Sequence, residues 1–411
     1  MTDVTLETLN KKLLNIIIVL LITGLAACSG ATPSTPETPA PEPTFIPEIT
    51  LVPSATLTPE FPVTQTATPT AIPTSTPTIT PSATQPLLEG TPLPGDTQTI
   101  SSSNASTVSL IATWNEATVS DLSWAPDGQS IAIANDSHIS LVDIQTRSQE
   151  DIIQTADGLI SIAFIPSGGL LASGSNPGTE SLGFNGLVEF WGHSESETAK
   201  PQFEDKRGVS DVAFSPDSRW FAAAFTSLEP EFDGSVDLRD TATWEITRTI
   251  TTGTVLNIAF SPDGQRLATT PDRYAIQMWR TDTNILLYTK YTSFTGAVNA
   301  IVFSPNGQNL ATGHYDGEIR IWAAANGELL QVIDTGTVIE SLAYSPDGTI
   351  LASGEGYFDN NINLWDTATG ALLRTLEGHN SSVSSLAFSP DGQLLASGSY
   401  DGNVRLWGIG P

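Results

Sequence analysis

The chain is 411 residues long, too long for one small domain, and its 45 Asp and Glu against 16 Lys and Arg give a formal net charge of −29. Its 39% hydrophobic content and nine Trp supply enough apolar mass for a sizeable core, which argues against a fibrous or fully disordered chain. The single cysteine excludes an intramolecular disulfide and a Cys-rich zinc or thiol-redox site. Nucleic acid is a poor partner, because binding it relies on Lys and Arg that neutralise phosphates.

The N-terminus has the pattern of an export signal. Two lysines precede the apolar run Leu13 to Ile22, which is too short to span a bilayer comfortably but suits a signal-peptide core. The next segment, Leu25-Ala26-Ala27-Cys28, resembles the lipobox of bacterial lipoproteins. This resemblance implies that residues 1–27 are removed and that Cys28 is diacylated, which would anchor the chain stably in a membrane, facing outside the cytoplasm within the cell envelope. An ordinary signal peptide with an incidental Cys, or an uncleaved anchor, remains open.

Residues 28–106 are predicted to form a disordered stalk behind the lipidated Cys28. From Ala31 to Ile100 the chain has 16 Pro, 19 Thr and no Lys or Arg, and its few hydrophobic residues follow no period. Proline-rich chain extends by about 3.1 Å per residue, so this stretch could reach on the order of 200 Å. It suits a tether, which O-glycosylation of its threonines could accompany, although plain disordered filler has the same composition.

The remaining chain, residues 107–411, repeats a four-residue turn signal built on proline. Pro presets φ at the second turn position and Gly closes the turn without steric cost, so each signal predicts a type I turn between two strands. The prolines are 40, 50, 46, 43, 41 and 44 residues apart. The seven signals are Ala125-Pro126-Asp127-Gly128, Ile165-Pro166-Ser167-Gly168, Ser215-Pro216-Asp217-Ser218, Ser261-Pro262-Asp263-Gly264, Ser304-Pro305-Asn306-Gly307, Ser345-Pro346-Asp347-Gly348 and Ser389-Pro390-Asp391-Gly392.

Each repeat supplies four short strands. In the last repeat, alternating runs cover Val383–Phe388, Leu394–Ser397 and Asn403–Trp407, and Ala371–Leu376 is the run that leads into it. Such a unit cannot hide both of its faces alone, so several must stack radially. We therefore predict an all-β fold, a seven-bladed β-propeller of four-stranded antiparallel blades, preceded by the disordered linker.

These repeats resemble those of the WD-repeat (WD-40) β-propeller family. The resemblance is carried by Leu364-Trp365-Asp366, Leu376-Glu377-Gly378-His379, Tyr400-Asp401-Gly402 and Leu406-Trp407. It implies a hydrogen-bonded tetrad of His, Ser or Thr, Asp and Trp within a blade, and the last repeat has all four members, as His379, Ser397, Asp401 and Trp407. Other repeats depart from the pattern: the fifth has Thr312, Asp316 and Trp322 but Phe294 where the His would fall, and Val142 and Arg239 replace the Trp of the first and third.

The ends of the repeat region suggest how the ring closes. The seventh repeat has only three strands before Pro411, and an unassigned alternating segment, Val108 to Trp114, precedes the first repeat. We expect this segment to pair with the last blade, joining the first blade to the last and removing an open edge.

The repeats differ mainly in the connection between their second and third strands. The distance from the turn proline to the third-strand Trp position is 16, 25, 23, 17, 17, 19 and 17 residues, with insertions at 176–186, 226–234 and 355–361. Loops on a rigid scaffold carry recognition, and aromatic anchors dominate interface energetics. The candidate binding face therefore comprises Phe184, Asn185, Glu231, Phe232, Asp233, Tyr357 and Phe358. The alternative is that the insertions are neutral and their aromatic side chains fold back onto their own loops.

Chemical sites have little support in the sequence. The four histidines show no metal-binding spacing; His379 is best explained as structural, and His314, near a turn, is expected to be solvated. The acidic run at 229–234 could hold calcium but lacks the full calcium-loop spacing. Gly174, Gly354 and Gly398 are explained as strand ends. No nucleophile elbow, P-loop or dinucleotide fingerprint is present, so we expect no catalytic residue, no metal and no cofactor.

The resulting hypothesis is a membrane-anchored extracytoplasmic WD-repeat protein that serves as a non-catalytic protein-interaction scaffold. Residues 107–411 hold 37 Asp and Glu against 14 Lys and Arg, so the expected partner is a protein, preferably a basic one, and the propeller is expected to be monomeric. Two alternatives stay open: a lactonase-like propeller hydrolase, and a propeller that binds carbohydrate or envelope polymer. The second rests on the likeness of residues 124–128 to TolB-like periplasmic propellers.

Overall fold

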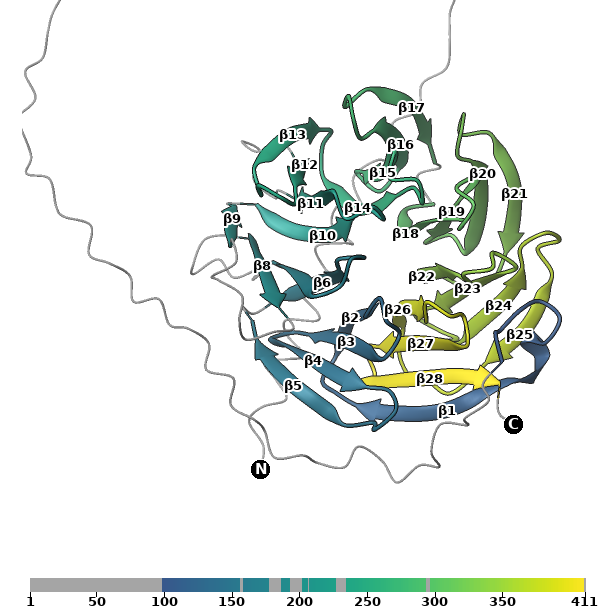
Figure 1. Ribbon diagram of the computed structural model, residues 1–411. Helices are drawn as coiled ribbons and strands as arrows, with labels where there is room; N and C mark the ends of the chain where they lie inside the picture. The colour runs from purple at the N-terminus through teal and green to yellow at the C-terminus, as the bar shows by residue number, and fades with distance from the viewer. Residues whose placement is uncertain are drawn as a thin grey trace, which may run out of the picture. The chain divides into compact units, whose positions relative to one another are not determined.

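Apart from one short 3-10 helix, the regular structure of the described residues consists of β-strands. The computed structural model describes residues 98–155, 158–176, 186–192, 202–205, 207–226, 234–292 and 296–409. Within them, seven four-stranded antiparallel sheets are arranged around a common centre (Figure 1). The predicted all-β, seven-bladed propeller is confirmed. No helix among the described residues is long and apolar enough to cross a membrane.

The blades follow one another along the chain, and blades 1 to 6 place their strands in sequence order from the centre outward, whereas blade 7 takes β1 as its outermost strand. The first three blades comprise β2 (Val119–Trp124), β3 (Ser130–Asn135), β4 (His138–Asp143) and β5 (Gln149–Gln154); β6 (Leu159–Phe164), β7 (Leu170–Ser175), β8 (Gly186–Gly192) and β9 (Phe203–Asp205); and β10 (Gly208–Phe214), β11 (Trp220–Thr226), β12 (Ser235–Asp240) and β13 (Ile246–Thr251). Blades 4 to 6 comprise β14 (Val255–Phe260), β15 (Arg266–Pro271), β16 (Ala275–Arg280) and β17 (Leu286–Tyr291); β18 (Val298–Phe303), β19 (Asn309–His314), β20 (Glu318–Ala323) and β21 (Leu329–Asp334); and β22 (Ile339–Tyr344), β23 (Ile350–Glu355), β24 (Ile362–Asp366) and β25 (Leu372–Leu376). Blade 7 comprises β26 (Val383–Phe388), β27 (Leu394–Ser399), β28 (Asn403–Ile409) and β1 (Val108–Asn115), which follows the short 3-10 helix η1 (Ala105–Thr107).

The proline turns join the two innermost strands of each blade. In blade 4, Gly264 has φ of 67° and donates its N–H to the carbonyl of Ser261 at 2.8 Å. The Ser261 hydroxyl bonds the Asp263 carboxylate at 2.5 Å and accepts the N–H of Arg266 at 2.9 Å. The motif is therefore a self-contained hairpin turn, which explains why its residues recur.

Small residues in the second strands let neighbouring blades approach closely. A Cβ added to Gly174 or Gly398 would lie 2.5 Å from a methyl group of Val209 or Val119 on the next blade. The interpretation of these glycines, and of Gly354, as strand ends has the right position, since each is the next-to-last residue of its strand. It does not explain the glycine, because a valine of the next blade fills the space that a side chain would take. Packing against the neighbouring blade, and not turn geometry, requires glycine there.

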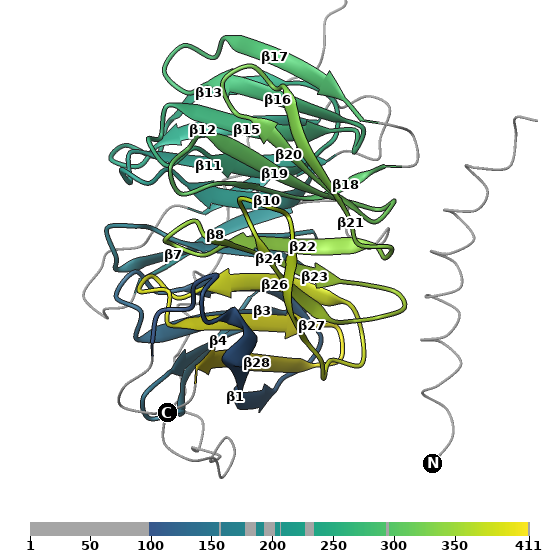
Figure 2. The same cartoon turned by 90° about the vertical axis from the view of Figure 1, so that its right-hand side faces the viewer.

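The ring closes as predicted, through pairing of the first strand with the last. β1 pairs antiparallel with β28, from Val108 opposite Ile409 to Asn115 opposite Asn403, and the two strands lie side by side in both views (Figures 1 and 2). The Trp114 side chain is only 1% exposed and packs in the core of this joint. The residues before β1 also contact blade 7. Ile100 is fully buried, and its backbone N–H donates to the carbonyl of Gly392.

Two departures from the repeat pattern are compensated by local packing. Val142, in place of Trp, is buried among the apolar residues shared by blades 7 and 1. Arg239 lies with its guanidinium carbon 3.6 Å from the ring centre of Phe203 on the preceding blade and donates to the carbonyl of Trp244. Trp244 in turn stacks on Phe190 with ring centres 4.3 Å apart. An aromatic cluster between blades 2 and 3 thus takes over the role of the missing Trp.

Replacing Arg147 by glycine should stabilise the propeller by about 1 kcal/mol. Arg147 lies in the turn after β4 with φ of 58°, where the corresponding turns of blades 5 and 6 have Gly327 and Gly370. Its guanidinium is buried, and two of its nitrogens lack a partner among the described residues. Urea unfolding of Arg147→Gly measures the gain, and Gly370→Ala, whose Cβ would collide with Gln331, is the control expected to lose stability. A loss of stability in Arg147→Gly would show that the arginine makes a contact worth more than the strain.

Candidate functional site

The four residues of the expected tetrad in blade 7 come together. The His379 imidazole bonds Ser397 Oγ through Nε2 at 2.8 Å and Asp401 Oδ2 through Nδ1 at 3.1 Å, and Trp407 donates to the same Ser397 hydroxyl at 2.9 Å. Burial lowers the pKa of His379, while the Asp401 charge acts in the opposite direction. The set joins β27, β28 and the turn between them with the loop that leads into the blade, which is a structural arrangement.

Blade 5 builds an equivalent network with a different histidine. His314 bonds Thr312 Oγ1 at 2.7 Å and the carbonyl of Gly296 at 2.9 Å, and Trp322 donates to Thr312 at 2.8 Å. The expectation that His314 is solvated was wrong: it is completely buried, because it fills the position left by the missing loop histidine. Burial, with a smaller effect of Arg320, lowers the pKa of His314 to about 4.

A chain of polar contacts links five blades along their innermost strands. In blades 1 and 3 the pairing register of the innermost strand shifts near its start, and Asp121 and Asp211 are the first paired residues after the shift. The Asp121 carboxylate accepts from Ser385 Oγ of blade 7 at 2.8 Å and from the N–H of Ile162 of blade 2 at 2.9 Å.

The second carboxylate continues this chain. Asp211 accepts from Ser161 Oγ of blade 2 at 2.9 Å and from the N–H of Ile258 of blade 4 at 2.8 Å. Burial raises the pKa of Asp211 to about 7, and the nearby charge of Asp121 contributes to the rise. Burial also raises the pKa of Asp121. Since every carboxylate oxygen is bonded to a neighbouring blade, these two residues act as inter-blade fasteners, and sequence reasoning did not identify them.

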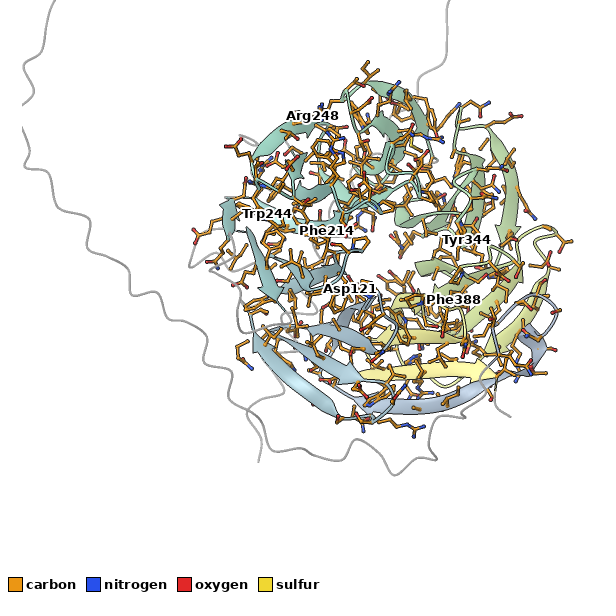
Figure 3. The ribbon with its side chains drawn as sticks, viewed as in Figure 1. Asp121, Phe214, Trp244, Arg248, Tyr344 and Phe388 are labelled. Atoms are coloured by element: carbon orange, nitrogen blue, oxygen red, sulfur yellow. The ribbon has the colours of Figure 1, made fainter. Side chains whose placement is uncertain are left out.

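The centre of the ring is lined by the innermost strands. Phe214, Tyr344 and Phe388 end three of these strands at equivalent positions, and Figure 3 places them with Asp121 toward the centre, whereas Trp244 and Arg248 lie farther out. Burial raises the pKa of the Tyr344 hydroxyl. No group of three or more His, Cys, Asp or Glu side chains in the described ranges is arranged to hold a metal ion.

Part of the predicted binding face can be described. Phe184, Asn185, Glu231, Phe232 and Asp233 lie outside the described residues, as does Phe294. Tyr357 and Phe358 belong to the connection between β23 and β24 and are 62% and 85% exposed.

A buried acid ends β23 directly before this connection. Glu355 is only 2% exposed and accepts the side-chain N–H of Asn363 at 2.5 Å. Burial raises the pKa of Glu355 to about 7, and the nearby Asp359 adds to the rise.

Two further tyrosines lie at the same end of neighbouring blades. We call the residues that connect second to third strands in blades 4 to 7 the loop face (residues 272–274, 315–317, 356–361 and 400–402). Tyr315 and Tyr400, on this face, are 50% and 51% exposed. The rings of Tyr315 and Tyr357 meet edge to face with centres 5.9 Å apart. Ser382 joins the other pair, because its hydroxyl accepts the N–H of Tyr357 and its carbonyl accepts that of Tyr400, both at 3.1 Å.

Tyr315, Tyr400 and Ser382 were not among the residues predicted for the binding face. A usable signal existed, since both tyrosines begin a Tyr-Asp-Gly turn at the same position of their repeats. The distance of Tyr357 from either of them could not be obtained from spacing, because its loop is longer than theirs.

Comparison with known protein families assigns the repeats. A comparison with curated proteins found no match to this chain. The family model "WD domain, G-beta repeat" matches residues 200–237, 286–323, 327–366 and 370–408. The last three segments each contain the outer strand of one blade and three strands of the next. The chain thus contains four recognised WD40 repeats within a seven-bladed propeller, a domain type that generally serves as a protein-interaction scaffold.

Proposed function

We propose that this protein is a lipid-anchored scaffold outside the cytoplasmic membrane that binds another protein through its loop face. The observation that carries the proposal is the exposed aromatic group of Tyr315, Tyr357, Phe358 and Tyr400 on three consecutive blades. Exposed aromatic side chains on a rigid support are the usual anchors of interfaces. The closed ring provides such a support, because β1 completes blade 7 by pairing with β28 and so ties the start of the propeller to its last blade.

The anchor is supported by the sequence of the N-terminus. Cys28 is the only cysteine and follows an apolar run in a segment that resembles a lipobox. The Thr- and Pro-rich stretch behind it would let the propeller stand away from the membrane surface. Together these segments support display at a distance from the lipid.

Lipidation is tested by expressing the full chain and Cys28→Ala in a bacterial host with an alkyne-labelled fatty acid. We expect the wild type to take up label and partition into detergent on phase separation, and Cys28→Ala to do neither, because no other thiol can be acylated. Protease added to spheroplasts then reports the side of the cytoplasmic membrane. Label retained in Cys28→Ala, or full protection of the propeller in spheroplasts but not in lysed cells, would contradict the proposed anchor and location.

Partner binding is tested by crosslinking in intact cells. We expect a crosslinked protein with the wild type that is lost when Tyr357 and Phe358 are replaced by serine; both side chains are exposed, so the fold should be unaffected. Shortened loops at 176–186 and 226–234 test the other predicted part of the face. Tyr291→Ser, at an 82% exposed position of outer strand β17, is the control. Crosslinks that persist in all loop variants but vanish in Tyr291→Ser would move the interface away from the loop face.

The non-catalytic assignment is tested on the same preparation. Metal analysis together with a screen of lactone and glycoside substrates should find no stoichiometric metal and no turnover above that of the Asp121→Asn variant. Turnover with bound calcium would replace the scaffold proposal by that of a propeller hydrolase.

A further inference from the structure

A carboxylate lies beneath the tyrosines of the loop face. Glu340 is the second residue of the innermost strand β22 and is partly buried. A Cβ added to Gly356 would lie 2.7 Å from Glu340 Cγ and 3.1 Å from Glu340 Oε1, so this side chain packs directly against the residue before Tyr357. No hydrogen bond to the Glu340 carboxylate is found within the described part of the chain.

The electrostatic surroundings tie Glu340 to the same tyrosines. Burial raises the pKa of Glu340, and the positive charge of Arg273 on blade 4 opposes the rise. The pKa values of Tyr357 and Tyr400 are raised by burial and further by the charge of Glu340. The acid therefore lies within electrostatic reach of both rings and is incompletely compensated by its cationic neighbour.

A planar cation is the ligand that best matches exposed tyrosine rings next to a carboxylate. Aromatic faces attract cations, and a guanidinium can stack on a tyrosine while it pairs with a carboxylate through two parallel hydrogen bonds. The propeller as a whole has the complementary sign, since residues 107–411 hold 37 acidic against 14 basic side chains. The neighbouring Asp359 is exposed on the same loop and would favour the approach of a basic segment.

We propose that Tyr315, Tyr357, Tyr400 and Glu340 form a recognition site for an arginine side chain presented by a basic segment of a partner protein. This inference rests on the proposed function and specifies its partner. Tyr315 and Tyr357, already in edge-to-face contact, and Tyr400, tied to Tyr357 through Ser382, supply the aromatic surfaces, and Glu340, packed against Gly356, supplies the counter-charge. The backbone of Tyr357 has φ of 67°, a conformation that a non-glycine residue adopts at some cost and that holds this residue outward. In the free protein, Arg273 compensates part of the charge that the ligand would meet.

The test measures binding of a dye-labelled Gly/Ser peptide with spaced arginines to the full-length protein by fluorescence anisotropy. We expect Tyr357→Ala and Glu340→Gln each to weaken binding about tenfold, Tyr357→Phe to retain it, and Arg273→Ala to strengthen it by removing the competing cation. Tyr291→Ala, the matched exposed tyrosine on β17, should bind as the wild type does. Unchanged melting temperatures establish that each variant is folded.

Controls on the peptide separate arginine recognition from general charge attraction. Replacing arginine by citrulline should abolish binding, and replacing it by lysine should weaken it, because lysine lacks the planar fork. Equal binding of the lysine or citrulline peptide, no binding by the wild type, or equal loss in Tyr291→Ala would each overturn the inference.

The two proposals fail in different ways. A cellular crosslink that needs Tyr357, combined with no arginine binding, would leave the scaffold in place with another kind of partner. Arginine binding that depends on Glu340, combined with no crosslink in cells, would leave the site without the proposed scaffold function.

Discussion

Removal of residues 106–114 should destabilise the entire propeller in a single transition and make it aggregate. The deletion takes away nearly all of β1, which supplies the fourth strand of blade 7, and with it the buried Trp114. The edge of β28 would then be open to pairing with other chains. Thermal unfolding followed by circular dichroism, with light scattering at several protein concentrations, measures both effects. An unchanged melting temperature would show that blade 7 is stable with three strands.

Point variants of Trp114 separate packing from hydrogen bonding at this joint. Trp114→Ala should cost about 3–5 kcal/mol in free energy of unfolding, because it leaves a cavity between blades 7 and 1. Trp114→Phe should cost much less, roughly 1.5 kcal/mol or below, because the indole N–H has no partner among the described residues. If Trp114→Phe were as damaging as Trp114→Ala, the indole nitrogen would have a partner that this structure lacks.

The stability of the propeller should depend on pH in two opposing ways, and Asp211→Asn should reveal one of them. The folded-state pKa of Asp211 is raised to about 7, so its contribution to stability is fully present below the unfolded pKa near 4 and is lost as the pH rises toward 7. The asparagine side chain of the variant is uncharged at every pH. Relative to the wild type, Asp211→Asn should therefore gain about 2 kcal/mol between pH 5 and pH 7, measured by urea unfolding.

His314 should make the free energy of unfolding depend on pH in the opposite direction. Its folded-state pKa is lowered to about 4, so its contribution is fully present above the unfolded pKa near 6.5 and is lost as the pH falls toward 4. His314→Gln, compared with the wild type over the same range, should lose the rise of stability with pH. The two variants serve as controls for each other, because a general effect of reduced stability would change both curves alike. Parallel curves for wild type and both variants would contradict the assigned protonation states.

The repeat pattern alone determined the architecture, for a physical reason. Turn geometry is local: a proline followed two residues later by glycine, as at Pro262 and Gly264, fixes a hairpin with few contacts from elsewhere. Seven such hairpins, with their alternating strands, leave radial stacking as the way to bury both faces of each unit. The closing strand could also be predicted, since Val108–Trp114 alternates and stands where the last blade is incomplete.

Only the tertiary structure decided how residues from different blades meet. His314 could not be recognised as a substitute for a missing tetrad histidine, because its role depends on the distance to Thr312 and to a loop carbonyl. The inter-blade bonds of Asp121 and Asp211 likewise depend on the irregularity in the innermost strands and on the approach of the next blade. The contact of Tyr315 with Tyr357, and the bonds of Tyr357 and Tyr400 to Ser382, depend on loop conformation across three blades. Spacing along a chain specifies local turns, whereas contacts between repeats depend on side-chain packing that the spacing does not contain.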